Sequence, residues 1–307
     1  MNPMATTEPP LRPRTAADVR LNVGWYRRGR YDPTTWIGQT WMVRAMLTPD
    51  GPATARVDWS DPQAELRVAA WGPGADRAAA AIEAMAAPGR VLGPPPGAPR
   101  LVRDAARRRP YLAAGASGDL YHALLPTILE QRITVREAMR QWSRLARRLG
   151  EAAPGPFPGL LLPPRPEHLA RIPAWWLHPL GIEAKRASAL AAVARVAGHL
   201  WEWAELADRG ELAAKLALIP GVGPWTVGTV LGPVCGDDDA VAVGDLHLPH
   251  LVSWNLAGEP RGDDQRMLEL LEPYRPQRGR VLRLLTLAGR RPPAYGPKHR
   301  ILPMHRF

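Results

Sequence analysis

The first third of the chain alternates apolar and polar residues with the period of a β-strand. TWMVRAML and TARVDW flank the turn-forming stretch TPDGPA, so residues 40–59 are predicted to form a β-hairpin. AELRVAAW predicts another strand, and DRAAAAIEAM predicts a helix that opens at Asp76. Residues 21–100 are therefore expected to form a small α+β domain that ends in a linker, APGRVLGPPPGAPR. The proline-rich, polar residues 1–20 are expected to be a flexible leader.

The rest of the chain repeats apolar residues at the three- and four-residue spacing of a helix. GDLYHALLPTILEQ has two cap candidates at its start, Ser117 and Asp119, and TVREAMRQWSRLARRLG begins at another, Thr134. Similar segments follow, which predicts a helical domain over residues 101–290. The expected fold class is therefore mainly α, with a helical core preceded by a small domain that contains a mixed sheet. The basic residues 291–307 are expected to form a tail on its surface.

Composition narrows the class of partner. The 307 residues carry a formal net charge of +11, which fits a polyanion such as nucleic acid. Arginine supplies nearly all of this charge in a chain rich in alanine and proline, so part of it reflects compositional bias. Cys235 is the only cysteine, which excludes an intrachain disulfide, a four-cysteine iron–sulfur cluster and a cysteine-rich zinc site. No apolar signal segment or membrane-length stretch is present, so we expect a cytoplasmic protein.

One short stretch, IPGVGPW, interrupts two apolar helical segments with two glycines and two prolines. Gly221 and Gly223 allow positive φ angles and the close approach of another backbone, and Pro224 suits the first turn of a second helix. The exposed amide groups of such a turn and helix start would bind a phosphate without reading base sequence. A plain corner between two helices is the alternative that these residues leave open.

This stretch resembles the hairpin of the helix-hairpin-helix DNA glycosylase superfamily, and the resemblance extends over about residues 115–290. It implies that the hairpin binds duplex DNA through Gly221, Val222, Gly223 and Thr226. It also implies that a K+ or Na+ ion can be held by backbone carbonyls, those of Ala217, Ile219 and Val222. No cofactor beyond this ion is expected.

An aspartate follows the hairpin at the end of the apolar run AVAVG. A partly desolvated carboxylate at Asp245 could stabilise the cationic sugar that forms as a glycosidic bond breaks, or it could orient a water. The resemblance gives the catalytic role to this aspartate, because VGDLHL lies at the family's distance from the hairpin. A helix cap is the alternative role for a lone aspartate. The acidic cluster Asp237–Asp239 is the rival carboxylate site and is expected to be a solvated loop.

Trp225 stands where the glycosylase–lyases of this superfamily carry a lysine that forms a Schiff base with the sugar. Tryptophan cannot form one, so we expect a monofunctional glycosylase that uses water. A tryptophan here resembles the DNA-3-methyladenine glycosylase II branch, which stacks aromatic side chains on a positively charged alkylated base. The resemblance therefore implies excision of alkylated purines, with Trp225 in the base pocket. Packing in the core is the alternative role for this tryptophan.

Other segments resemble the family less specifically. LLPTILEQRIT resembles its helix and wedge loop, which would place Gln131 and Arg132 in the gap left by a flipped nucleotide; a surface arginine is an equal alternative. EPYRPQRGRVLRLL resembles a segment that would put Tyr274 in the pocket, and IPAWWLHPLG would add Trp176, although core packing explains both equally well. His247 lacks enough nearby ligands for a metal site and is expected to contact DNA or to be structural.

The combined expectation is a monomeric, monofunctional DNA glycosylase that flips a damaged base out of duplex DNA and has no membrane association. Two alternatives remain open. One is a DNA-binding protein that uses the same hairpin without catalysis, and the other is a glycosylase for deaminated or oxidised bases. A neutral base of that kind needs hydrogen bonds to its edge, and the sequence assigns no residue to them.

Overall fold

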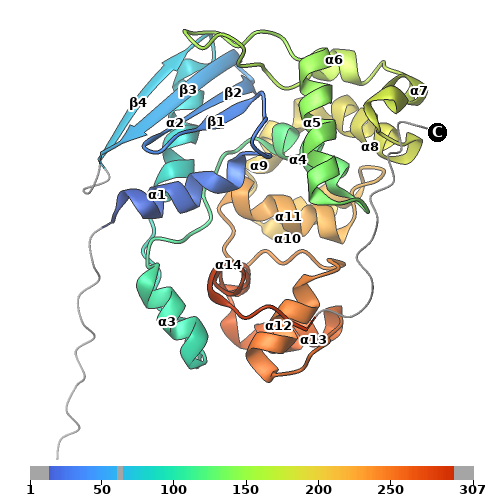
Figure 1. The fold of residues 1–307 in the computed structure, drawn as a ribbon. Helices are drawn as coiled ribbons and strands as arrows, with labels where there is room; N and C mark the ends of the chain where they lie inside the picture. Colours follow the sequence, from blue (N-terminus) through green and yellow to red (C-terminus); the bar gives the residue numbers. More distant parts are fainter. Residues whose placement is uncertain (1–13, 61–64, 294–307) are drawn as a thin grey trace, which may run out of the picture.

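The computed structural model describes residues 14–60 and 65–293. This part of the chain contains fourteen α-helices and one four-stranded sheet (Figure 1). The expected fold class, mainly α with a small sheet toward the N-terminus, is confirmed. Within the described ranges, no helix combines the length and hydropathy needed to cross a membrane. Most of the expected tail, from residue 294 onward, lies outside the described residues.

The sheet follows the order of the sequence. Its strands are Thr35–Ile37 (β1), Trp41–Thr48 (β2), Gly51–Trp59 (β3) and Leu66–Trp71 (β4). The predicted hairpin is confirmed, because β2 and β3 pair from Trp41 opposite Asp58 to Thr48 opposite Gly51. All pairs are antiparallel, so the expectation of a mixed sheet was wrong. The connections between consecutive strands are too short for a parallel crossover.

Both faces of the sheet are covered. Helix α2 (Ala75–Ala86) packs on one face, where its Ile82 shares a core with Met46 and Val57. The opposite face packs against the proline-rich loop that follows helix α5 (Val135–Leu149), through Val43 and Leu162. This alternation of buried residues on two faces is what the period of two dictates. The sheet is therefore joined to the helical part of the chain and does not form a separate module (Figure 1).

The N-terminal helix corrects one expectation. Helix α1 spans Ala16–Val23, so residues 16–20 are not part of a leader. Thr15 and Asp18 form a capping box, in which the Asp18 carboxylate accepts hydrogen bonds from the Thr15 amide at 2.9 Å and hydroxyl at 2.8 Å. Val19 and Val23 are fully buried in the core that α1 shares with α2 and the sheet. This helix was not predicted because it is short, its apolar residues show little periodicity, and a proline-rich stretch precedes it.

Most of the helices form a first group, called here the large lobe. Its members are α4 (Leu120–Glu130), α5 (Val135–Leu149), α6 (Pro166–Leu169), α7 (Ala174–Leu177), α8 (Ala184–Arg195), α9 (Ala197–Ala204), α10 (Arg209–Ala217) and α11 (Pro224–Cys235). Of the predicted caps, Asp119 and Thr134 are confirmed, since they accept hydrogen bonds from the amides of His122 and Glu137, while Ser117 is not the cap. The helical pattern that continues through residues 184–204 is broken at Val196, which separates α8 from α9.

The remaining helices form the small lobe. They are α3 (Arg100–Arg108), α12 (Leu248–Ala257), α13 (Asp264–Leu271) and α14 (Arg278–Ala288). Their shared core joins Val102 and Ala105 of α3 to Val281 and Leu284 of α14, nearly 180 residues later in the chain. The region predicted as one helical domain therefore consists of two lobes with separate cores (Figure 1).

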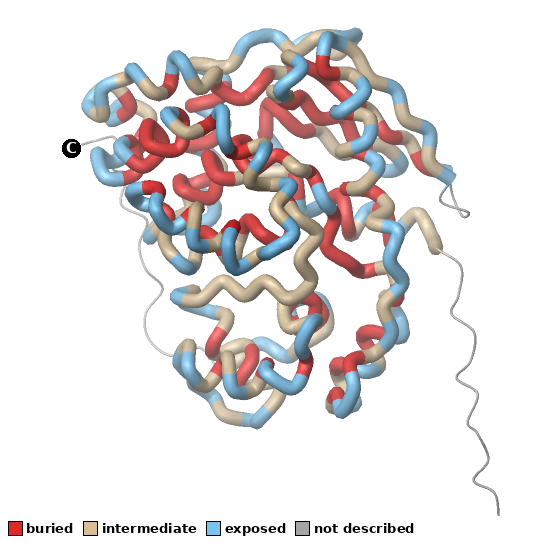
Figure 2. Tube along the Cα trace, turned by 180° about the vertical axis from the view of Figure 1, so that it is seen from behind, coloured by how far each residue is buried: buried red, intermediate tan, exposed pale blue. Residues whose placement is uncertain are grey.

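An extended segment, residues 236–247, connects the two lobes. Figure 2 shows that much of it is of intermediate exposure, between the buried cores on either side. A Cβ atom at Gly228 of α11 would lie 2.1 Å from the Val241 carbonyl oxygen, and one at Gly279 of α14 would lie 2.5 Å from that of Ala240. Glycine at both positions therefore lets the segment pass closely between the two helices.

Candidate active site

A cavity of about 470 Å³ opens where the two lobes meet. The connecting segment and helices α11 and α14 form its walls, and the chain around residue 25 adds another wall. The side chains that matter for the argument below are Trp25, Trp225, Asp245 and Arg283. Two of these, Trp225 and Asp245, were predicted from the sequence to share a site, and the structure brings them together.

Asp245 holds a fixed orientation at the cavity. Its Oδ2 accepts a hydrogen bond from Trp225 Nε1 at 3.0 Å. Its Oδ1 accepts from the backbone amides of His247 at 2.8 Å and Leu248 at 2.9 Å, at the start of α12. The capping role and the cavity position that the sequence offered as alternatives therefore occur together in one carboxylate. Both oxygens are held, and the side chain remains only half-buried.

The residue before Asp245 helps to aim it. Gly244 has φ of 93°, which disfavours a side chain, and its amide donates to Asp264 Oδ1 at 3.0 Å. This bond ties the end of the connecting segment to the first turn of α13. The segment is thus held by α13 here and by the two glycine contacts farther back, so the carboxylate stands on backbone that is fixed at both ends.

The hairpin has the expected form, with α10 and α11 on either side of a tight turn. Gly221 has φ of 88°, and a Cβ there would lie 2.5 Å from Ala189 Cβ. Val222 is buried and its amide donates to the Ile219 carbonyl at 2.9 Å, which closes the turn. Pro224 occupies the first turn of α11, as predicted. Gly221 is exposed and Gly223 is half-buried, so the turn is open to a partner.

Gln131 and Thr226 are placed differently from the expectation. Gln131 Nε2 donates to the Gly221 carbonyl at 2.9 Å and to Thr226 Oγ1 at 3.0 Å, so this amide ties the end of α4 to the hairpin. A role for Gln131 as a wedge is therefore not supported by its position. Thr226 is buried as a whole residue, so its position offers neither its hydroxyl nor its backbone amide to a phosphate.

Arg132 lies at an exposed position, and its role as a wedge stays a prediction. Its side chain is exposed at the end of α4, beside the residue that binds the hairpin. Within residues 14–60 and 65–293, it is the one non-glycine residue with positive φ, at 58°. Such a conformation costs free energy in an arginine, and conformations of this kind concentrate at functional sites.

Two predicted pocket aromatics lie elsewhere. Tyr274 is buried in the core of the small lobe and does not line the cavity. Trp176 lies in α7, where its ring packs on the large lobe and the Arg148 guanidinium lies 5.4 Å from the ring centroid. The expected pocket positions of these two residues were wrong. Both pack at a core, which was the stated alternative, because an aromatic residue fits a core as well as a pocket. Burial raises the pKa of the Tyr274 phenol, in keeping with its position.

The histidines show no metal site. His247 is exposed beside Asp245, a position compatible with a DNA contact. His250 accepts a hydrogen bond from the Gly262 amide at 3.3 Å, so it holds the α12–α13 turn. In the part of the chain that the structure describes, no group of three His, Cys, Asp or Glu side chains could hold a metal ion.

The acidic cluster is a structural junction and not the solvated loop that was expected. Asp238 accepts hydrogen bonds from the Ala114 amide at 2.7 Å and from Arg90 at 3.0 Å. Asp239 accepts from the Arg278 guanidinium at 2.7 and 3.0 Å. These carboxylates are used to join the connecting segment to its neighbours, so they are poor rivals to Asp245 for catalysis.

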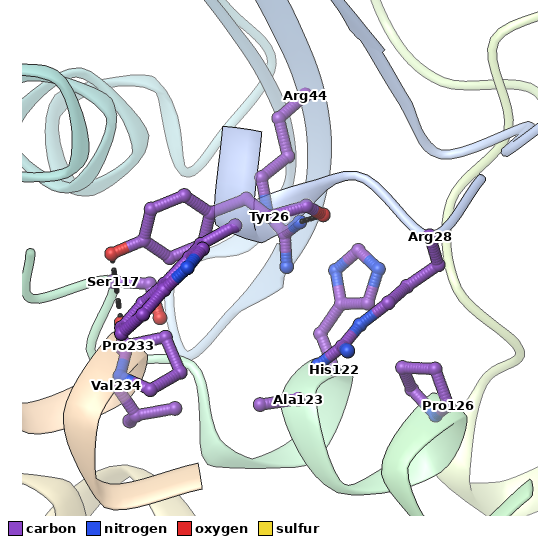
Figure 3. Close-up of a pocket in the computed structure, with 10 residues that line it drawn as sticks. Tyr26, Arg28, Arg44, Ser117, His122, Ala123, Pro126, Pro233 and Val234 are labelled. Atoms are coloured by element: carbon purple, nitrogen blue, oxygen red, sulfur yellow. Dashed lines mark hydrogen bonds between the residues drawn. The ribbon is translucent and has the colours of Figure 1, made fainter. Parts of the chain in front are cut away.

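Trp25 and Arg283 are functional candidates that the sequence did not reveal. Trp25 lies in the short 3-10 helix Gly24–Tyr26, and its neighbour Tyr26 donates from its hydroxyl to the Pro233 carbonyl of α11 at 3.0 Å (Figure 3). This bond brings the N-terminal region against the large lobe. The Arg283 guanidinium carbon lies 3.3 Å from the centroid of the Trp25 ring. No local pattern predicts a contact between residues so distant in sequence.

A second, much smaller cavity lies beneath this junction. Figure 3 shows Arg44, Tyr26 and His122 around it, and its volume is about 20 Å³, enough for about one water. His122 Nε2 lies 3.0 Å from Thr34 Oγ1, and burial lowers the pKa of this histidine. The polar side chains around this cavity connect the sheet region to α4. The cavity itself is too small for a base.

Among residues 14–60 and 65–293, no lysine lines the large cavity. Lys215 lies on α10, 3.5 Å from Glu211, and Lys185 is exposed on α8. The third lysine, Lys298, falls outside the described residues. The described chain thus offers no amine at the cavity wall for a Schiff base.

Comparisons with known proteins agree with this architecture. No protein-family model and no curated protein sequence matches the chain. A 3-methyladenine DNA glycosylase from Archaeoglobus fulgidus superposes with a TM-score of 0.70 at 16% identity, covering 89% of this chain and 95% of its own. An 8-oxoguanine glycosylase/lyase from Clostridium acetobutylicum gives 0.53 at 11%, covering 83% and 98%. A Schizosaccharomyces pombe 3-methyladenine DNA glycosylase in complex with abasic DNA gives 0.51 at 19%, covering 62% and 91%.

These likenesses define the fold. The chain has the fold of the helix-hairpin-helix DNA glycosylases, as the hairpin sequence predicted. The similar structures include both 3-methyladenine and 8-oxoguanine enzymes, so the fold does not select the base.

Proposed function

We propose that this chain is a monofunctional DNA glycosylase, which hydrolyses the bond between a base and C1′ of its deoxyribose in duplex DNA. The observation that carries the proposal is the bond between Asp245 and Trp225 at the wall of the large cavity. A volume of about 470 Å³ lies within the range of small-molecule sites, about 300–1,000 Å³. The cavity can therefore hold an extruded base beside an oriented carboxylate.

The chemistry needs little beyond these groups. When the C1′–N bond breaks, both electrons leave with the base and positive charge develops on the sugar. The Asp245 carboxylate would stabilise that charge and orient a water, whose oxygen bonds to C1′ while its proton passes to the carboxylate. The indole of Trp225 would stack on the base and at the same time keep Asp245 in place.

The absence of a lysine from the cavity lining supports the monofunctional reaction. A lyase step requires an amine that attacks C1′ and forms a Schiff base, and Trp225 occupies the position beside Asp245. Water is then the nucleophile, and the expected product is an intact strand that contains an abasic site.

Contacts to DNA are proposed at the hairpin and at Arg132. The turn is open to solvent at Gly221 and Gly223, and the amides of Gly223 and Trp225, at the start of α11, suit a phosphate. Arg132 is placed to fill the gap in the duplex when a nucleotide leaves it. We expect the protein to act as a monomer, because each part of this site comes from one chain.

A monovalent cation bound at the hairpin would strengthen the same contact with the DNA backbone. The carbonyls of Ala217, Ile219 and Val222 lie in or beside the turn, and backbone oxygens are suitable ligands for Na+ or K+. Ile219 accepts a single hydrogen bond in the turn, so its oxygen keeps a free lone pair. If this proposal is right, affinity for DNA will be higher in K+ than in an equal concentration of a bulky organic cation.

The identity of the base is the open part of the proposal. The stacking surface of Trp225 supports an electron-poor purine, as predicted for alkylated purines. Arg283 opposes this choice, because a guanidinium in the cavity repels a base that carries positive charge. The two features favour different bases.

The class of reaction is tested by incubating the protein with duplexes that each contain one damaged base. A monofunctional glycosylase releases a free base and leaves a strand that breaks only after alkali. Strand breakage without alkali would contradict the proposed reaction, and DNA binding without release of any base would support the non-catalytic alternative.

A further inference from the structure

Arg283 is the unusual group in the large cavity. It is only 7% exposed, and its Nε and Nη1 atoms are buried without a hydrogen-bond partner. Its guanidinium stacks closely on the Trp25 ring, with 3.3 Å between the guanidinium carbon and the ring centroid. Burial lowers the pKa of this guanidinium to about 10, so it remains positively charged at neutral pH. The Asp238 carboxylate is near enough to raise this pKa, but it accepts no hydrogen bond from Arg283. Two buried donors without an acceptor cost free energy and call for an explanation.

The neighbouring Arg280 shows what a structural arginine looks like on the same helix. Its guanidinium donates to the carbonyls of Leu112 at 2.9 Å, Gly93 at 2.6 Å and Leu92 at 2.7 Å. These bonds satisfy it and fix the segment that leads to α3. Arg283 has no such carbonyls, although it lines the same cavity one turn farther along α14.

We propose that Arg283, stacked on Trp25, is the residue that selects the base, and that it favours a neutral 6-oxopurine such as hypoxanthine over a purine with a positive charge. The inference rests on the proposed glycosylase function. Arginine forms two parallel hydrogen bonds with the O6 and N7 acceptors of a 6-oxopurine. Adenine presents an amino group in place of O6, so the same guanidinium rejects it.

Charge gives a second reason for the preference. A neutral base leaves as an anion when the C1′–N bond breaks, and a guanidinium at its edge stabilises the negative charge that develops. An alkylated, cationic base leaves as a neutral molecule and gains no such help. The cation at Arg283 therefore accelerates release of the neutral base and only repels the cationic one.

Undamaged guanine also carries O6 and N7, so a further step must exclude it. Extrusion provides that step, because a mispaired base costs less to flip than a paired one. Hypoxanthine that arises from adenine lies opposite thymine and is mispaired. Guanine opposite cytosine would be held in the duplex by its full pairing.

The test compares single-turnover release of hypoxanthine and of 7-methylguanine, a cationic base, from otherwise identical duplexes. The natural protein is expected to prefer hypoxanthine. Arg283→Met keeps a long apolar side chain against Trp25 and removes both the charge and the donors. We expect it to lower hypoxanthine release by about 10- to 100-fold and to leave 7-methylguanine release equal or faster.

Two further variants separate the causes. Arg283→Lys keeps the charge and loses the forked geometry, so it should still discriminate against 7-methylguanine while it releases hypoxanthine more slowly. Arg290→Met removes an exposed arginine just beyond α14, outside the cavity lining, and should leave the ratio of the two rates unchanged. Thermal unfolding checks that Arg283→Met folds, and we expect its Tm to be no lower, since methionine removes two buried donors that have no acceptor.

The inference is overturned if Arg283→Met leaves the ratio of the two rates unchanged or slows both equally. Failure of the proposed function looks different, because then no variant releases either base. In that case the same proteins are compared by their affinity for the two duplexes, and equal affinities for natural protein and Arg283→Met overturn the inference as well.

Discussion

The bond between Trp225 and Asp245 lets one side chain serve two purposes. The indole ring forms part of the cavity wall, and its N–H holds the Asp245 carboxylate at the same wall. Lysine in its place could offer a nucleophile, but it could not offer a stacking surface. The replacement therefore fits a site in which the carboxylate and a water carry out the whole reaction.

This dual role can be tested at the residue itself. Trp225→Phe retains an aromatic ring and removes the N–H that donates to Asp245. Because a hydrogen bond to a charged group contributes about 1.5–3 kcal/mol, we expect base release to slow by about 10-fold or more. Affinity for the damaged duplex should stay within about threefold. A loss of affinity with an unchanged rate of release would show that only the ring matters.

Sequence and structure agree at residues whose role depends on local chain geometry. The sequence predicts Gly221 from the turn, Pro224 from the helix start and Asp245 from its distance to the hairpin. Each of these patterns lies within a short stretch of sequence. Tyr274 and Trp176 could not be placed, since an aromatic side chain fits a core as readily as a cavity. The same limit applied to most of the twelve tryptophans.

Trp25 and Arg283 illustrate what sequence patterns omit. Their contact joins the 3-10 helix Gly24–Tyr26 to the last described helix, across more than 250 positions. It exists because Tyr26 binds α11 and because the small lobe presents α14 to the same cavity. Only the packing of three separate regions brings these side chains together.

At the scale of elements, the connecting segment matters most. It delivers Asp245 to the cavity and passes between α11 and α14 at two glycines. A side chain at Gly228 would strike backbone atoms, which cannot rotate away as the end of a flexible side chain can. The hairpin and the carboxylate are thus coupled through the second helix of the hairpin.

This coupling predicts the effect of one methyl group. Gly228→Ala should push the segment away from α11, lower stability by about 1–3 kcal/mol and reduce base release more than it reduces DNA binding. The matched control is Gly198→Ala in α9, where an added Cβ meets no atom within 4 Å. That variant should be neutral or slightly stabilising, by up to about 1 kcal/mol. Thermal unfolding and release rates measure both, and equal behaviour of the two variants would contradict the role given to the segment.

At the scale of the molecule, two lobes and the sheet build one cavity from distant parts of the chain. The sheet side contributes Trp25, the large lobe contributes Trp225, and the small lobe contributes Arg283. The sequence did not show which helices belong to each lobe, because that division depends on α3 packing with α14. The N-terminal region is thus part of the site and not an appendage.

Charge belongs to this scale too. The net charge of +11 and the backbone contacts proposed at the hairpin predict binding that depends strongly on salt. Raising the salt concentration from about 50 to 200 mM should weaken affinity for undamaged duplex by about 100-fold or more, because phosphate contacts release counterions. A fluorescence anisotropy titration measures this directly. An affinity that does not change over this range of salt concentration would rule out the proposed contacts between the hairpin and the DNA phosphates.

The central claim is that Asp245 performs glycosidic bond cleavage in this cavity, and Asp245→Asn tests it most directly. Asparagine keeps an oxygen that can accept from the amides of His247 and Leu248, so the fold at the start of α12 should be retained. The account predicts that the natural protein releases a damaged base, while the variant binds the same duplex with similar affinity and releases the base at least about 100-fold more slowly. Equal release by the two proteins would contradict the assignment of Asp245.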